Sequence, residues 1–99
     1  MNEKFPQLHY FFGSYYNQDW TVEYDTPEQV LNAFVNESAA SDRKLVRQEL
    51  VILLERKMEE SALKNYMLRD LSCYYCYWND WESGGSWLQH IIDKLDSQP

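Results

Sequence analysis

Apolar residues recur at helical spacing along most of the chain, and this pattern predicts several short helices. The first helix is predicted over residues 7–16, directly after Pro6, because proline suits the first turn of a helix. Its apolar face comprises Leu8, Phe11, Phe12, Tyr15 and Tyr16. A second helix is indicated after Thr26, since threonine can cap the free backbone amides and Gln29 three residues later completes a capping-box pattern. Its apolar face comprises Val30, Leu31, Phe34 and Val35.

The middle of the chain carries the clearest amphipathic stripe. Small residues at positions 38–41 interrupt the helical pattern, and a long helix is predicted after them. Its apolar face comprises Leu45, Val46, Leu50, Val51, Leu53, Leu54 and Met58. The opposite face holds basic and acidic residues that can pair with one another, so we expect it to be solvated. A shorter helix is predicted over residues 61–71.

Two segments break the helical spacing. Trp20, Val22 and Tyr24 alternate within residues 18–25, which favours a short strand or an extended connector. Residues 72–85 are rich in aromatic side chains and end in two glycines, which can adopt left-handed backbone angles. This second segment is therefore predicted to form a long loop.

A last helix is predicted from Ser86, where a capping-box pattern recurs. Its apolar face comprises Leu88, Ile91, Ile92 and Leu95. The whole pattern predicts an all-α fold: a small single-domain bundle of four to six helices over residues 1–99, with a long aromatic loop before the last helix. The predicted core includes Val30, Phe34, Leu50, Leu53, Leu54, Leu88 and Ile92.

Length and composition narrow this picture further. A chain of 99 residues leaves no room for a second independent core, and 44% hydrophobic residues exclude wholesale disorder. The longest apolar run, at 50–54, is far shorter than the roughly 20 residues that span a bilayer. The start of the chain lacks the basic and apolar regions of a secretory signal. We therefore expect a cytoplasmic protein with reduced cysteines and no membrane partner.

The distribution of charge points to a basic partner. Sixteen acidic against nine basic residues give a net charge of −7, which disfavours direct binding to nucleic acid. Residues 1–40 hold six acids and one base, residues 71–99 hold four acids and one base, and the middle is nearly neutral. If the two ends meet in the fold, they form one negative surface that can steer a basic protein to fast association.

Candidate catalytic and metal-binding chemistry is sparse. The spacing of Cys73 and Cys76 suits a redox pair or half of a zinc site, but His9 and His90, the other strong ligand candidates, stand at opposite ends of the chain. We therefore expect two buried thiols, no metal and no cofactor. The sequence shows neither a glycine-rich phosphate loop nor a clear nucleophile and base, so we predict no catalytic residues and no enzyme activity.

The aromatic residues are more informative. Eight tyrosines and four tryptophans exceed what a small core can hide, and such side chains dominate the energetics of protein interfaces. Within the predicted loop, Tyr77 and Trp81 alternate with Asp80 and Glu82. This mixture is typical of a surface that binds a basic protein.

Several motifs resemble a known family. The opening motifs are Phe5-Pro6, Phe11-Phe12-Gly13, Gln18-Asp19-Trp20 and Thr26-Pro27-Glu28, and the later ones are Cys73-Tyr74-Tyr75 and Trp87-Leu88. Together they cover most of the chain and resemble the immunity proteins of bacterial contact-dependent growth inhibition systems. The sequence departs from this pattern at residues 76–81, where that family is expected to have a turn with proline and glycine.

The resemblance implies a small helical cytoplasmic protein that binds the toxic C-terminal domain of a cognate toxin. Such toxins are often nucleases, and inhibition would occur by stoichiometric occlusion, with no turnover and no cofactor. The acidity of the chain agrees independently, because a nuclease that grips phosphates must present a basic cleft.

The motifs shared with the family are assigned to the fold, so we expect the partner-binding residues among the acidic and aromatic positions peculiar to this chain. These are Glu23, Tyr24, Asp25, Tyr77, Asp80, Trp81 and Glu82. Two alternatives remain open at this point. One is a metal or redox module that uses Cys73 and Cys76, and the other is a general acidic adaptor for another basic protein.

Overall fold

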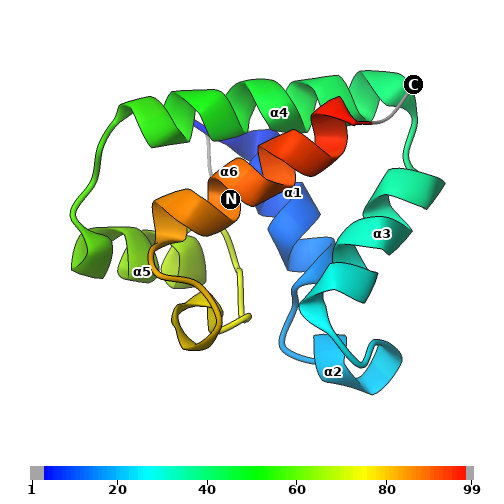
Figure 1. Ribbon diagram of the computed structural model, residues 1–99, viewed down its shortest axis with the longest axis horizontal. Helices are drawn as coiled ribbons and strands as arrows, with labels where there is room; N and C mark the ends of the chain where they lie inside the picture. Colours follow the sequence, from blue (N-terminus) through cyan, green and yellow to red (C-terminus); the bar gives the residue numbers. More distant parts are fainter. Residues whose placement is uncertain (1–3, 98–99) are drawn as a thin grey trace.

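The computed structural model describes residues 4–97, and Figure 1 shows their helices and connecting segments. The elements in chain order are α1 (Pro6–Tyr15), α2 (Trp20–Glu23), α3 (Pro27–Glu37), α4 (Ala40–Glu55), α5 (Glu60–Arg69), the 3₁₀ turn η1 (Tyr77–Asn79) and α6 (Gly84–Asp96). No strand occurs in this part of the chain, which confirms the all-α prediction. None of these helices has both the length and the apolar character needed to cross a bilayer.

Helix α4 is the longest element and organises the others. It lies along the upper edge in Figure 1 and packs against both α1 and α6, with α5 and α3 at opposite ends of the molecule. A carboxylate of α4 also caps another helix, because Glu49 Oε1 accepts hydrogen bonds from the backbone amides of Gln7 and Leu8, each at 3.0 Å. The free amides at the start of α1 are thereby satisfied from a distant part of the sequence.

The predicted core is largely confirmed. Of its members, Leu54 alone is half-buried, and it packs against the remainder, which are buried. At the centre, the indole of Trp87 meets Tyr16 and Tyr75 edge-on, at centroid distances of 5.3 and 4.9 Å, and stacks on Tyr77 at 5.6 Å. Part of the aromatic surplus is therefore core, which the composition alone did not indicate.

The expected strand or connector at residues 18–25 is wrong, because this segment contains the helical turn α2. The side chain of Asn17 starts the turn by accepting a hydrogen bond from the Asp19 amide at 2.9 Å, and its amide group donates to the Ser14 carbonyl. Trp20 and Tyr24, four residues apart, pack against the core, whereas Val22 is 82% exposed. Only Trp20 and Tyr24 therefore share the inward face, and Val22 points away from it.

The last helix begins earlier than predicted. Ser83, not Ser86, is its N-cap, and the side chains of Ser83 and Ser86 satisfy each other's backbone amides. Gly84 lies inside the helix with an ordinary negative φ, so it is not a left-handed turn residue. Its role is close packing, because a Cβ there would collide with Leu63 and with the Tyr77 hydroxyl.

Candidate interaction surface

Hydrogen bonds around the turn between α2 and α3 hold the backbone of three acidic residues in place. Thr26 and Gln29 form a complete capping box at the start of α3. The Gln29 side chain also accepts a hydrogen bond from the Asp25 amide at 2.8 Å. Glu28 then projects from the first helical turn, and Glu23 lies at the end of α2. All three carboxylates are exposed on a backbone that local hydrogen bonds hold in place.

The segment before α6 is also ordered by side-chain contacts. The Tyr75 hydroxyl donates a hydrogen bond to Asp80 Oδ2 at 2.6 Å. The Tyr77 hydroxyl donates to Glu60 Oε2 at 2.5 Å, and the same carboxylate accepts from the Gly84 amide at the start of α6. The aromatic loop is therefore held at two points, and Asp80 is oriented by a buried tyrosine.

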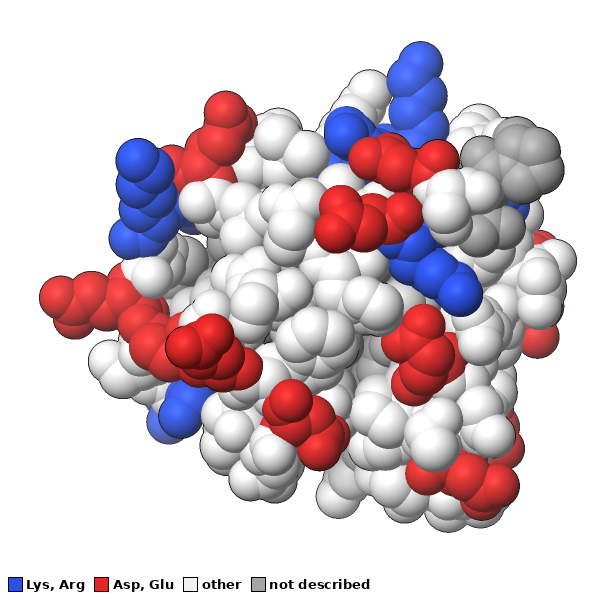
Figure 2. All heavy atoms as spheres, in the orientation of Figure 1, with Lys and Arg blue, Asp and Glu red and all other residues white. Residues whose placement is uncertain are grey.

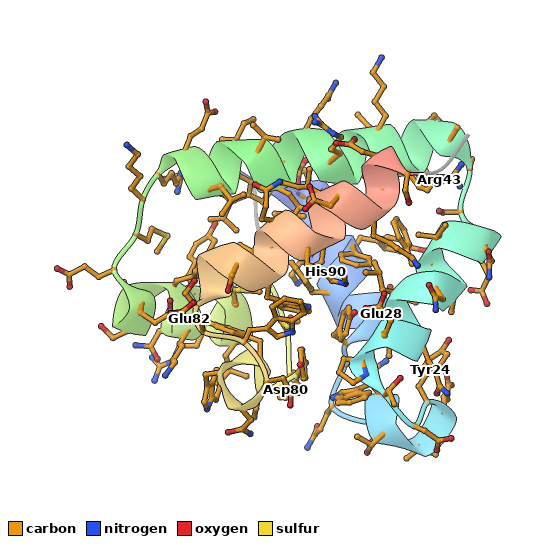
Figure 3. The ribbon with its side chains drawn as sticks, viewed as in Figure 1. Tyr24, Glu28, Arg43, Asp80, Glu82 and His90 are labelled. Carbon is orange, nitrogen blue, oxygen red and sulfur yellow. The ribbon has the colours of Figure 1, made fainter. Side chains whose placement is uncertain are left out.

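The two acidic segments of the chain meet at His90. Its Nε2 atom lies 2.8 Å from Glu28 Oε1 of α3, and its ring packs against Trp81 of the loop at 4.9 Å. Lys94, one turn further along α6, lies 3.8 Å from Glu28 Oε2. Figure 3 shows Glu28 and His90 directed toward each other between α3 and α6. The two acidic segments therefore contact each other here, through a carboxylate that also lies beside two basic side chains.

We define the acidic face as Glu23, Asp25, Glu28, Asp80 and Glu82, all of which are exposed. Figure 3 shows Glu28, Asp80 and Glu82 on the viewed side of the molecule, with Tyr24 beside α2 and α3. In Figure 2, in the same orientation, acidic side chains lie over both halves of the viewed face: beside basic side chains in the upper half, and with few basic neighbours in the lower half. The lower half of this face is therefore mainly acidic.

The predicted aromatic contact residues differ in accessibility. Tyr24 and Trp81 are half-buried, so each presents part of its ring to solvent. Tyr77 is only 1% exposed and lies between Trp87 and Trp78, contrary to the expectation that it stands on the surface. Residues 71–78 alternate between buried and more exposed positions, and Tyr77 stands on the buried side. The sequence could not show which side faces inward, because tyrosine and cysteine occur on both.

The electrostatic environment keeps the loop tyrosines neutral. Burial, reinforced by the hydrogen bond to Asp80, raises the pKa of Tyr75, and burial with the hydrogen bond to Glu60 raises that of Tyr77. Each phenol therefore stays a hydrogen-bond donor to its carboxylate through the neutral range. Burial and the nearby Glu37 and Glu23 also raise the pKa of Tyr24.

The cysteines are free and differ in environment. Cys73 is buried, and burial raises the pKa of its thiol to about 12, which opposes formation of the reactive thiolate. Cys76 is exposed, so the expectation of two buried thiols is wrong for this residue. Within residues 4–97, no group of three or more histidine, cysteine or acidic side chains is arranged to hold a metal ion.

Three features of the molecular surface were not predicted from the sequence. Glu28 and His90 were not among the predicted site residues, although the capping box already placed Glu28 on the outer side of the first turn of α3. The pairing of His90 with Glu28 joins residues 62 positions apart and had no sequence signal. Tyr10 was assigned to no surface, yet it is 67% exposed.

Comparison with known proteins places the chain in a family. The family of the CdiI immunity protein matches residues 4–95. A chain in the crystal structure of a CdiA-CT/CdiI complex from Y. kristensenii 33638 superposes with a TM-score of 0.88 and 32% sequence identity, covering 94% of this chain and 99% of that one. No curated protein matches the sequence. The fold, the sequence motifs and these matches together show that the chain belongs to the CdiI immunity protein family.

Proposed function

We propose that this chain binds the C-terminal toxin domain of its cognate CdiA protein and neutralises it by forming a stoichiometric complex in the cytoplasm. The observation that carries this proposal is the junction of Glu28, His90 and Trp81, where the two acidic segments of the chain meet. The similar chain from Y. kristensenii comes from a CdiA-CT/CdiI complex, which supports a toxin domain as the partner.

The charge of the acidic face supports a basic target of nuclease type. A nuclease must attract phosphates, so its cleft carries lysine and arginine side chains. An acidic face fits such a cleft, steers the encounter and repels wrong partners of like charge. Inhibition then needs only occlusion of the cleft, so this chain acts as an inhibitor and performs no catalysis of its own.

The residues of this surface have different roles in binding. Glu23 and Asp25 are exposed beside the α2–α3 turn and accelerate the encounter through long-range attraction. Asp80 is held in one orientation by Tyr75, so it can pair with a toxin base at little further cost in conformational entropy. Trp81 is half-buried against His90 and contributes an aromatic anchor.

Titration of the toxin domain against this chain tests the proposal. The domain encoded beside this chain is purified, and its cleavage of RNA and of DNA is measured at increasing amounts of the immunity protein. We expect cleavage of one of these substrates and complete inhibition at one chain per toxin domain. Persistent activity at excess immunity protein would contradict neutralisation, whereas inhibition of a toxin that cleaves neither nucleic acid would retain it and refute the nuclease assignment.

The alternative of a zinc or redox module is tested in the same assay. Replacement of both cysteines, in the variant Cys73→Ala/Cys76→Ser, is expected to leave inhibition intact, because Cys73 contributes packing and Cys76 is exposed. Loss of inhibition by the folded double variant, or recovery of about one zinc ion per chain from the purified protein, would favour the metal module instead.

A further inference from the structure

A second surface feature, lined by none of the predicted contact residues, lies where α1, α3 and α4 meet. A groove opens there over a floor of Phe34 and Val46, both buried. Tyr10 and Tyr15 of α1 line one side, and Glu37 and Asp42 line the other from the end of α3 and the start of α4. The groove therefore has an apolar floor, two aromatic rings and two carboxylates.

The carboxylates of this groove are presented to an incoming group. The Tyr15 hydroxyl donates a hydrogen bond to Glu37 Oε1 at 2.9 Å, which holds that carboxylate at the rim. The nearby base Arg43 directs its guanidinium to the carbonyl oxygens of Val35 and Ser38 at the end of α3. Asp42 is exposed in the first turn of α4. The groove is thus a negative recess. The nearby Arg43 is hydrogen-bonded to backbone carbonyl oxygens at the end of α3.

Tyr10 gives the groove an exposed aromatic ring. Its ring is 67% exposed on α1, a helix whose other aromatic residues pack into the molecule. An exposed ring beside two carboxylates suits a flat cation, since the ring face attracts positive charge and the carboxylates accept its hydrogen bonds. Arginine meets both demands better than lysine, because its planar guanidinium stacks on a ring and donates in a fork.

We propose that this groove receives the side chain of one arginine of the toxin domain, which stacks on Tyr10 and pairs with Glu37 and Asp42. The inference rests on the proposed function, because the basic toxin domain supplies the occupant. Burial and then Glu37 raise the pKa of Tyr24, one of the predicted contact residues, so the charge of the groove is felt at the proposed interface. The groove extends the contact surface from α2 onto α1 and α4.

Substitutions in the groove test this inference with the purified toxin domain. Tyr10→Ala, Glu37→Gln and Asp42→Asn are compared with Ile52→Ala and Glu55→Gln, which alter exposed apolar and acidic residues on α4 outside the groove. Tyr10→Ala and Glu37→Gln should each weaken the dissociation constant about tenfold or more, and the two controls should change it less than about twofold. Thermal melting of each variant verifies folding, and Tyr10→Ala suits the test best because its side chain is largely exposed.

A double-mutant cycle then identifies the occupant. Each toxin arginine and lysine is replaced by alanine and measured against wild-type and Glu37→Gln immunity protein. We expect one arginine whose loss weakens binding about tenfold or more with the wild type and has little effect with Glu37→Gln. Coupling to a lysine, or unchanged affinity in all three groove variants while the wild type binds, would overturn the groove assignment alone. Absence of binding by the wild type would instead refute the proposed function.

Discussion

At the scale of single residues, the same contact recurs in three places: a tyrosine hydroxyl donates a hydrogen bond to a carboxylate. Tyr15 holds Glu37, Tyr75 holds Asp80 and Tyr77 holds Glu60. Such bonds fix an acidic side chain before any partner arrives, because the ring is anchored in the core or against it. The surplus of tyrosine in the sequence therefore serves the orientation of acids as well as the core.

The role of Tyr75 can be separated from its contribution to stability. We expect Tyr75→Phe to lower stability by about 1–3 kcal/mol, because a hydrogen bond to a charged group is lost, and to speed dissociation from the toxin domain by freeing Asp80. Tyr77→Phe is the matched control, since it breaks the equivalent bond to Glu60 and leaves Asp80 in place. Dissociation rates measured by surface plasmon resonance should rise for Tyr75→Phe alone. An equal rise in both variants would show that only the stability of the loop matters.

The two loop tryptophans outside the core, Trp78 and Trp81, are expected to differ in their contribution to binding. Trp81 packs on His90 at the junction of the acidic segments, whereas Trp78 packs under Lys64 of α5. Trp81→Ala should cost at least about 2 kcal/mol of binding free energy if the indole is an anchor, and Trp78→Ala should cost much less. Isothermal titration calorimetry with the toxin domain measures both. The reverse order would move the interface from α6 to α5.

At the scale of elements, helix signals in the sequence were reliable where they were local. The capping box at Thr26 and the apolar stripe of α4 depend on residues within one or two turns, and both are present in the structure. The short helix α2 was missed because an exposed apolar residue, Val22, stands between Trp20 and Tyr24 and gives this turn the apolar alternation of a strand. The start of α6 was missed because Gly84 was read as a loop residue. The fold requires glycine there for another reason, since a Cβ would collide with Leu63 of α5.

The stripe of α4 supports a stability prediction. Leu50 is fully buried where α4 packs against other helices, so Leu50→Ala should leave a cavity and cost about 2–5 kcal/mol. Ile52 lies on the same helix and is half exposed, and Ile52→Ala should cost less than half as much. Thermal and urea unfolding measure both variants. Equal losses would show that the buried face of α4 was assigned incorrectly.

At the scale of the whole molecule, buried phenols and a buried thiol predict sensitivity to alkali. Burial raises the pKa of Cys73 from 9.0 to about 12, and burial followed by the hydrogen bond to Glu37 raises that of Tyr15 from 10.0 to about 12. An acid whose folded-state pKa is raised stabilises the fold fully below its unfolded pKa and loses this effect as the pH rises toward the folded value.

Melting temperatures should therefore begin to fall as the pH rises past about 9, the unfolded value for the thiol, and fall further once the tyrosines ionise. Circular dichroism melts across this range measure the effect. Cys73→Ala should lose less stability than the wild type in the first part of the range, although it starts from a lower value. A flat profile up to the tyrosine range in the wild type would contradict the burial of Cys73.

Only part of the candidate site could be predicted from the sequence at this scale. The charge of each segment and the identities of Glu23, Asp25, Asp80 and Glu82 are properties of the chain itself. That the two segments lie against each other depends on the pairing of His90 with Glu28 and the packing of Trp81, which are tertiary contacts. The sequence therefore predicts a negative surface, whereas the neighbours of each acidic residue come from the fold.

Association kinetics with the toxin domain at several salt concentrations test the acidic face most directly. The wild type should associate rapidly at low salt and more slowly as salt rises, because screening weakens the attraction between the face and a basic cleft. The double variant Glu23→Lys/Asp25→Lys should associate more slowly with a weaker dependence on salt, while Glu55→Lys, at the end of α4, should change both much less. Equal association rates for all three proteins at every salt concentration would contradict binding through the acidic face.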